Sequence, residues 1–241
     1  MAGVPSGTSA VNNGEIMKKL LVFLFLLRIS LVYCNLVTVA QDSTGDFLDI
    51  QAAIIACTNY DTILVYPGIY YENIDYMGKV LVIGSFNMIT GEDEFIHSTI
   101  IDGNNAGRVV TLMDDEGDGT KIIGFTIKNG YCERGAGIRL SGSCLEVRNC
   151  IIESNQATIS AGGIYVAYES EIFLSKVTVR YNYSLFSFGG IGTSPDSSID
   201  FDPDNLCSIY ANYGPDACDM RIKNDLEDPQ YSLFTLIRSV V

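Results

Sequence analysis

Three segments of this sequence can be laid on one another: GFTIKNG at residues 124–130, NCIIESN at residues 149–155 and KVTVRYN at residues 176–182. Their first residues lie 25 (149 − 124) and 27 (176 − 149) positions apart. In each segment apolar and polar side chains alternate with period two, which is typical of a strand with one buried face. A fixed period of this length indicates a repeat protein whose units bury their apolar sides against one another.

Two further series recur with nearly the same period. GAGIRL, AGGIYV and FGGIGT start at residues 135, 161 and 188, and LEV, IFL and IDF start at residues 145, 172 and 199. Three short strands per repeat predict an all-β fold, a parallel β-helix in which each turn lies on the next. The alternation predicts inward columns of stacked side chains: Phe125/Cys150/Val177, Ile127/Ile152/Val179, Ile138/Ile164/Ile191, Leu140/Val166/Thr193, Leu145/Ile172/Ile199 and Val147/Leu174/Phe201.

The outward and corner positions are consistent with this register. Lys128, Glu153 and Arg180 form a column of alternating charge, which keeps like charges apart. Asn155 and Asn182 also stack, and a ladder of asparagines satisfies backbone groups at a turn. Glycines occupy the corners, where side chains would crowd: Gly135, Gly137, Gly162, Gly163, Gly189 and Gly190.

Other repeat folds explain the pattern less well. A leucine-rich array needs an L-x-x-L-x-L motif and a helical array needs a 3.6-residue period, and these segments have neither. An antiparallel sandwich is the stronger rival, because it also consists of short strands and glycine-rich turns. Similar residues at one fixed period favour the β-helix over the sandwich.

The segment before the repeats predicts a cap. Ile50, Ala53 and Ile54 lie on one face at helical spacing, and residues 62–66 form a strand ended by Pro67 and Gly68. A short helix at the end of the coil would protect an open sheet edge. We therefore expect an N-terminal cap at residues 35–60, the β-helix at residues 61–220 and a C-terminal tail at residues 221–241.

Residues 1–34 are interpreted as a signal peptide with an upstream extension. Lys18 and Lys19 precede an apolar run at residues 20–27, which is the order of a secretory signal, and Met17 is a candidate start. The alternative is a transmembrane anchor, but Arg28 interrupts a run already shorter than the ~20 residues that span a bilayer. We expect the mature chain to be secreted or at the cell surface, without a stable membrane span.

Composition supports a folded, acidic protein. Hydrophobic residues make up 47% of the chain and charged residues 18%, so the composition of a disordered chain is absent. The formal net charge is −14, from 15 basic and 29 acidic residues. Binding to a phosphate backbone requires a basic patch, so no nucleic-acid partner is expected.

Six cysteines follow the signal segment: Cys57, Cys132, Cys144, Cys150, Cys207 and Cys218. Disulfides are permitted in an exported protein, but the sequence does not choose among the fifteen pairings. A zinc site is not expected, because the chain has one histidine and no C-x-x-C pair. Cys150 is expected to pack in the core.

The chain resembles the pectin-lyase-like right-handed parallel β-helix proteins, in their exported bacterial branch. The resemblance covers roughly residues 38–220 and is specific for the fold, not for an activity. This superfamily includes polysaccharide lyases, hydrolases, epimerases, adhesins and members of no known activity. Its members often continue into further domains, so the chain is interpreted as a candidate truncated copy. The matching segments are IQAAI at 50–54, DTILVYPGIYYENI at 61–74, STIIDGNNAG at 98–107, GFTIKNG at 124–130, GAGI at 135–138, GGIY at 162–165 and DPDNLCSIYANY at 202–213.

The resemblance implies chemistry that this sequence matches only in fragments. Lyases of this fold use an Arg or Lys base and carboxylates that hold calcium against an acidic sugar. The segment DDEGDG at residues 114–119 is acidic, but the twelfth position of a calcium loop starting at Asp114 is Phe125. A solvated acidic turn is the preferred interpretation, and a calcium site is the alternative. The oxygen-bearing residues considered are Asp114, Asp115, Glu116 and Asp118, and the similar set Asp200, Asp202 and Asp204.

The hydrolase members carry paired aspartates, a GHG turn and a late RIK. Arg221, Ile222 and Lys223 spell RIK, and Asp114 with Asp115 match the paired aspartates. The GHG turn is missing, however, and the single histidine, His97, precedes both matches. His97 is expected in a surface loop. No catalytic, cofactor-binding or metal-binding residue is therefore assigned.

A binding role needs fewer residues. We expect Arg139, Tyr165, Phe173 and Tyr181 to form an outward surface on which sugars could lie, or simply to cover a sheet. The sequence thus favours an exported interaction module with polysaccharide or a cell-surface glycan as its candidate ligand. The alternative is a lyase or glycoside hydrolase acting on an acidic polysaccharide. Carboxylates gathered with an Arg or Lys at one place would favour the enzyme.

Overall fold

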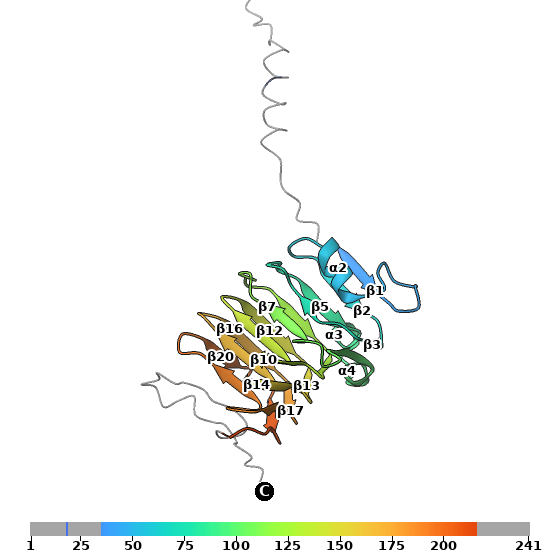
Figure 1. Cartoon of the computed structure of the whole chain (residues 1–241). Helices are drawn as coiled ribbons and strands as arrows, with labels where there is room; N and C mark the ends of the chain where they lie inside the picture. The colour runs from blue at the N-terminus through green and yellow to red at the C-terminus, as the bar shows by residue number, and fades with distance from the viewer. Residues whose placement is uncertain (1–17, 19–34, 216–241) are drawn as a thin grey trace, which may run out of the picture. The chain divides into compact units, whose positions relative to one another are not determined.

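Stacked parallel strands dominate the computed structural model, which describes residue 18 and residues 35–215. The expected signal peptide and the tail with Arg221, Ile222 and Lys223 lie outside the described residues, residue 18 excepted. Within residues 35–215 the chain winds from one sheet to the next and returns about one strand spacing further on, so the colours of Figure 1 change steadily along the stack. The fold is the predicted right-handed parallel β-helix.

The strands form three long sheets and one short sheet. The seven-stranded sheet contains β1 (Leu36–Val39), β2 (Thr62–Val65), β5 (Val82–Ser85), β8 (Lys121–Ile123), β12 (Cys144–Arg148), β16 (Glu171–Ser175) and β20 (Ser198–Phe201). The six-stranded sheet contains β3 (Gly68–Tyr70), β6 (Thr99–Asp102), β9 (Thr126–Lys128), β13 (Ile151–Glu153), β17 (Thr178–Arg180) and β21 (Ser208–Tyr210). The five-stranded sheet contains β4 (Ile74–Asp75), β7 (Val110–Leu112), β11 (Ile138–Ser141), β15 (Ile164–Ala167) and β19 (Ile191–Thr193). The three-stranded sheet contains β10 (Tyr131–Arg134), β14 (Gln156–Ser160) and β18 (Tyr183–Ser184).

The predicted register is confirmed in each long sheet. Ile138, Ile164 and Ile191 are direct strand partners, and all three are buried. Ile127, Ile152 and Val179 pair in the six-stranded sheet, as do Leu145, Ile172 and Ile199 in the seven-stranded sheet. These columns form one continuous apolar core. At the outer ends of two columns Thr193 and Phe201 are only half-buried.

The outward charges also stack as predicted. Glu153 pairs with Lys128 on one side and with Arg180 on the other, and the Arg180 Nε lies 2.8 Å from the Glu153 carboxylate. The column begins one turn earlier, because Asp102 pairs with Lys128 at 3.7 Å. Alternating signs therefore continue over four turns.

The predicted helix is present as α2 (Ile50–Ala56), which lies beside β1 in Figure 1. The Asp49 side chain accepts a hydrogen bond from the Ala52 N–H, which caps the helix. Glu72 accepts two further N–H groups, from Ile50 and Gln51, at 2.8 Å each. β1 precedes this helix and pairs with β2, so the seven-stranded sheet begins before the helix.

Two short helices lie at one corner, between β5 and β6: α3 (Asn87–Thr90) and α4 (Glu94–Ser98). His97 is exposed, but it lies in the last turn of α4 and not in a loop, which corrects the expectation from sequence. None of the helices that the described residues form has the length and apolar character needed to cross a bilayer.

A buried asparagine ladder fixes another corner. Asn155 donates its side-chain amide to the Asn182 Oδ1 at 3.0 Å, and Asn182 donates in the same way to Asn212 at 3.0 Å. Each amide also donates to a backbone carbonyl, Asn155 to Ile127 and Asn182 to Ile152. The two predicted ladder positions are confirmed, and Asn212 extends the ladder by one turn.

Replacing the central ladder residue tests this account. Asn182→Ala leaves buried donors and acceptors of two neighbouring turns unpaired, so we expect the free energy of unfolding to fall by about 3 kcal/mol. Urea unfolding followed by circular dichroism measures the change. Gln156→Ala, which removes an exposed amide, is the control and should change stability by less than about 0.5 kcal/mol. Equal effects of the two variants would contradict a structural ladder.

Candidate functional site

The outer face of the five-stranded sheet carries a column of polar groups. Asp75 pairs with Thr111, Thr111 with Arg139, and Arg139 with Tyr165, on the consecutive strands β4, β7, β11 and β15. Neighbouring members are thus about 4.8 Å apart along the stack. We call these four residues the polar column. It presents a carboxylate, a hydroxyl, a guanidinium and a phenol in one line.

Arg139 has an unusual environment within the polar column. Its guanidinium carbon lies 5.9 Å from the centre of the Tyr165 ring, a cation–π arrangement. Its Nε is buried and has no hydrogen-bond partner among the described residues. A buried donor without a partner costs free energy, and a ligand oxygen could supply the missing acceptor.

Gly135 covers this pair. Its φ is +59°, and a Cβ there would lie 2.8 Å from the Tyr165 Cβ and 3.1 Å from the Arg139 Cβ. Both its backbone conformation and the crowding therefore require glycine. Arg108 reinforces the corner, because its Nε donates to the Gly135 carbonyl at 3.0 Å. Burial lowers the pKa of Arg108 and the charge of Arg139 acts in the same direction, whereas the Asp75 carboxylate opposes both.

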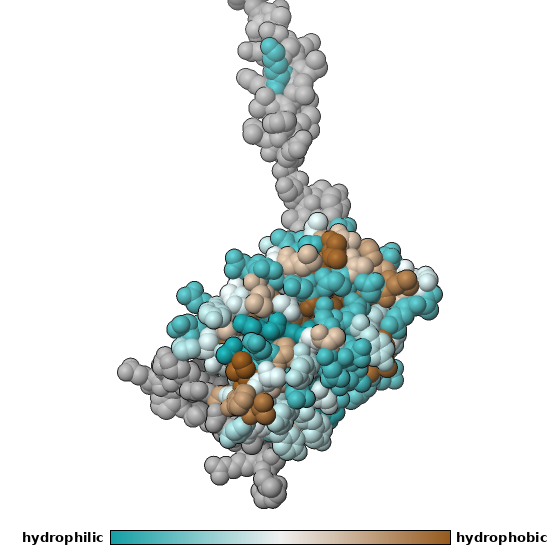
Figure 2. Space-filling model, in the orientation of Figure 1, coloured by the Kyte–Doolittle hydropathy of each residue, from teal (hydrophilic) through white to brown (hydrophobic). Residues whose placement is uncertain are grey.

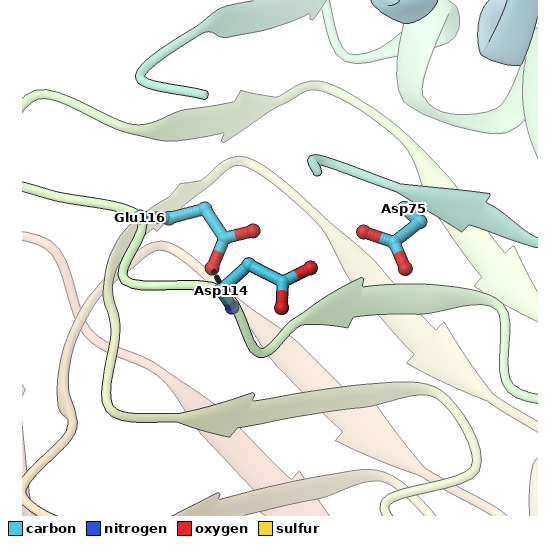
Figure 3. A group of neighbouring side chains, drawn as sticks. All are labelled: Asp75, Asp114 and Glu116. Atoms are coloured by element: carbon cyan, nitrogen blue, oxygen red, sulfur yellow. Dashed lines mark hydrogen bonds between the residues drawn. The ribbon is translucent and has the colours of Figure 1, made fainter. Parts of the chain in front are cut away.

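Three carboxylates gather at the Asp75 end of the polar column. One carboxylate oxygen each of Asp75, Asp114 and Glu116 lies within 4.8 Å of the others. In Figure 3 the Asp114 carboxylate points toward Asp75, while Glu116 turns back to the Asp114 backbone. The structure therefore places the Asp114 carboxylate beside Asp75, at one end of the column that contains Arg139.

Glu116 is a structural member of this group. It is buried, whereas Asp114, Asp115 and Asp118 are exposed, so the expectation of a fully solvated acidic turn is wrong for this residue. Its carboxylate accepts hydrogen bonds from the Gly78 N–H at 2.9 Å, the Asp114 N–H at 3.1 Å and the Ser143 hydroxyl at 2.7 Å. These three donors occupy both of its oxygens.

The cluster does not by itself fit a calcium ion. Calcium takes six to eight oxygen ligands. Glu116 already accepts three protein hydrogen bonds spread over both of its oxygens, and the Asp75 Oδ1 accepts the Met77 N–H at 2.8 Å. Asp75 and Asp114 are left to supply oxygens, too few for a site built from protein groups alone.

Removing the buried carboxylate tests its structural role. Glu116→Ala leaves two backbone N–H groups and a hydroxyl without an acceptor, so we expect a loss of about 3 kcal/mol in the free energy of unfolding. Asp114→Ala is the matched control, because that side chain is exposed, and should cost less than about 0.5 kcal/mol. Chemical denaturation of both variants gives the comparison. If Glu116→Ala left the free energy of unfolding unchanged, the carboxylate would not be structural and would be free for a ligand.

The second acidic set, Asp200, Asp202 and Asp204, does not converge on one point. Asp202 accepts hydrogen bonds from the Asn205 amide at 2.9 Å, the Ser175 hydroxyl at 2.7 Å and the Asp204 N–H at 3.0 Å. These donors, that of Asn205 first, lower the pKa of Asp202 to about 2. The carboxylate therefore closes a turn after β20.

This pKa predicts a pH dependence. A carboxyl whose pKa is lowered on folding stabilises the protein above its unfolded pKa of 3.8, and the contribution is lost as the pH falls toward about 2. Asp202→Ala should therefore be less stable than the original chain at pH 6, and the difference should shrink on acidification. Urea unfolding at pH 6 and at pH 2.5 measures both values. A difference that stays constant would refute the assignment.

The outward surface expected from sequence is divided among three sheets. Arg139 and Tyr165 are partners in the five-stranded sheet, but Phe173 belongs to the seven-stranded sheet and Tyr181 follows a strand of the six-stranded sheet. Arg148 lies over Phe173 and Arg180 over Tyr181. The four side chains therefore do not form one surface, because outward positions on different sheets point to different sides of the coil.

A shallow cavity of about 180 Å³ lies beside Phe173, on the seven-stranded sheet. Glu146 at its border is paired with Lys121 at 2.6 Å and also contacts Arg148. The remaining lining comes from Asp118, Gly119, Thr120, Cys144, Leu145, Glu171, Ile172 and Asp200. This cavity is separate from the polar column.

The described cysteines are all unpaired: Cys57, Cys132, Cys144, Cys150 and Cys207. Cys218 lies outside the described residues. Cys150 occupies the predicted inward position, and burial raises the pKa of its thiol to about 12. Its thiol is therefore protonated near neutral pH, in agreement with a packing role.

Sequence reasoning missed Asp75, Thr111 and Arg108. The early turns are irregular, since Val110 pairs with Ile74 at a separation of 36 residues (110 − 74) and with Ile138 at 28 (138 − 110). A signal was nevertheless present. VVTL at 109–112 aligns with GIRL at 137–140, and this alignment places Thr111 beside Arg139.

Comparisons with known proteins add little. No protein-family model matches the chain, and no curated protein matches it. Among solved structures a pectin methylesterase from carrot is similar, with 17% sequence identity and a TM-score of 0.41, over 70% of this chain and 64% of that chain. The match thus spans less than two thirds of that enzyme. The fold assignment rests on the strand register described above.

Proposed function

We propose that the chain is an exported interaction module that binds polysaccharide along the outer face of the five-stranded sheet. Export through residues 1–34 would place it outside the cell or at the cell surface. The observation that carries the proposal is the polar column, in which Asp75, Thr111, Arg139 and Tyr165 lie on consecutive turns of one rigid face.

The chemistry of the column suits a sugar polymer. Sugar hydroxyls are donors and acceptors, and the column offers both kinds of group together with an aromatic ring. The unpartnered Arg139 Nε supports an oxygen-rich ligand, and a carboxylate would bind it most strongly. A chain molecule crossing successive turns would meet several of these groups at once.

A charge-removing substitution on this face tests the proposal. Arg139→Ala should weaken binding of a uronate polymer about tenfold, because one charge-assisted hydrogen bond is lost. Affinity electrophoresis of the folded protein through gels containing the polymer measures the effect. Arg148→Ala removes the same charge from the seven-stranded sheet and should bind nearly as the original chain does. Equal weakening by both variants would indicate that binding depends on the net charge of the protein and not on this face.

A polysaccharide hydrolase or lyase is the second candidate. It is favoured by the approach of Asp75 and Asp114 within 4.8 Å, since retaining glycosidases hold two carboxyl groups about 5–5.5 Å apart. Asp75 is two turns from Arg139 in the polar column, and Asp114 lies beside Asp75. Incubation with uronate polymers, with and without calcium, would reveal new reducing ends or ultraviolet absorbance of an unsaturated product.

The two candidates give different results in that assay. Turnover that Asp114→Asn abolishes would establish the enzyme. Binding without turnover would favour the interaction module.

A further inference from the structure

A column of exposed aromatic side chains lies on the three-stranded sheet. Tyr131 pairs with Gln156, Gln156 with Tyr183, and Tyr183 with Tyr213 on successive turns. The tyrosines are 44%, 39% and 57% exposed, respectively. We call these four residues the tyrosine column. It is distinct from the polar column, which lies on the five-stranded sheet.

The buried asparagine ladder positions the tyrosine column. Gln156, Tyr183 and Tyr213 each directly follow a ladder asparagine, and Tyr131 follows Gly130, whose N–H donates to the Asn155 Oδ1 at 2.8 Å. Because the ladder points inward, the next side chain on each turn points outward. The rings therefore repeat at the pitch of the coil, about 4.8 Å per turn and about 9.6 Å across Gln156.

Close packing makes the backbone under these rings rigid. A Cβ on Gly162 would collide with the backbone oxygen of Tyr183, and one on Gly189 would collide with the backbone nitrogen of Tyr213. Glycine is therefore needed at both positions so that the strands can approach. A ligand binding here would meet aromatic groups that are already aligned, which reduces the entropy lost on binding.

The chemistry of the tyrosine column is aromatic and uncharged. Among the described residues no group forms a hydrogen bond with the hydroxyls of Tyr131, Tyr183 or Tyr213. The exposed neighbour on β10 is Glu133, and apolar Leu185 and Phe186 follow β18. On the face shown in Figure 2 apolar surface appears near the position of β14, next to hydrophilic surface.

We infer that the tyrosine column is a second carbohydrate subsite, which takes an uncharged polysaccharide by stacking sugar rings on its phenol faces. Flat sugar faces carry C–H groups and their edges carry hydroxyls, which match a ring face and a free phenol hydroxyl or amide. An acidic sugar is disfavoured at this surface because Glu133, the exposed neighbour on β10, is negative and the tyrosine column itself contains no cationic group. The inference deepens the proposed function but depends on other residues.

Substitutions in the full chain separate stacking from hydrogen bonding. Tyr183→Ala should weaken binding of a soluble neutral glucan or mannan about tenfold, since an aromatic contact is lost. Tyr183→Phe should stay within about threefold, because its ring remains. Tyr168→Ala replaces a tyrosine outside the column that is more exposed than Tyr183, 68% against 39%; it is the control and should bind as the original chain does. Gel retardation measures affinity, and tyrosine fluorescence, free of tryptophan in this chain, reports contact with the rings.

Several outcomes would overturn the inference. They are the absence of retardation by any neutral polymer, unchanged binding by Tyr183→Ala, and equal loss in Tyr168→Ala. A concentration-dependent dimer that Tyr183→Ala disrupts, seen by sedimentation, would assign the surface to a protein partner instead. Arg139→Ala distinguishes the two proposals. If Arg139→Ala loses binding of the uronate polymer but keeps binding of the neutral polymer, both surfaces are supported. If the original chain binds the neutral polymer but no uronate polymer, only the proposal for the polar column is refuted.

Discussion

The backbone hydrogen bonds between successive turns are the constraint on which this molecule depends. They place each residue directly beside its counterpart one turn away, so every position must be compatible with its own neighbours in the column. Inside, isoleucine, valine and leucine satisfy this requirement by packing. At one corner, asparagine does so because its amide both donates and accepts. Outside, charges of opposite sign alternate, as in Lys128, Glu153 and Arg180.

The sequence predicted the repeated part of the fold because stacking leaves a periodic record. The sequence alone aligns Ile138, Ile164 and Ile191, because the turns between them have nearly the same length and carry no insertion. The polar column was not predictable in the same way. Asp75 joins the column of Arg139 only through irregular early turns, with Thr111 between them. The alternation of a strand also does not encode the side of the coil that it occupies. The burial of Glu116 could not be predicted either, because its hydrogen-bond donors come from residues 78 and 143, which are distant in sequence.

The two proposed surfaces use the same scaffold in different ways. Along the polar column each turn contributes a different chemical group, so the face can distinguish parts of a ligand. Along the tyrosine column the turns contribute nearly the same group, which favours a polymer with a repeating unit. Both surfaces are rigid because glycines at positions 135, 162 and 189 allow neighbouring strands to pack closely beneath them.

The corner after β5 shows how such a coil accommodates extra sequence. Residues 86–98 separate β5 from β6, whereas only residues 124–125 and 149–150 occupy the same corner on later turns. The additional segment folds back along the outside of the stack, where the Ile96 carbonyl accepts the Thr126 hydroxyl and Asn87 accepts the Asn149 amide, both at 2.8 Å. β5 and β6, on either side of this segment, keep their register with β8 and β9 of the next turn. Descendants of this chain could therefore acquire new loops at that corner without disturbing the interior, while an insertion within a strand would shift every later residue to the wrong face.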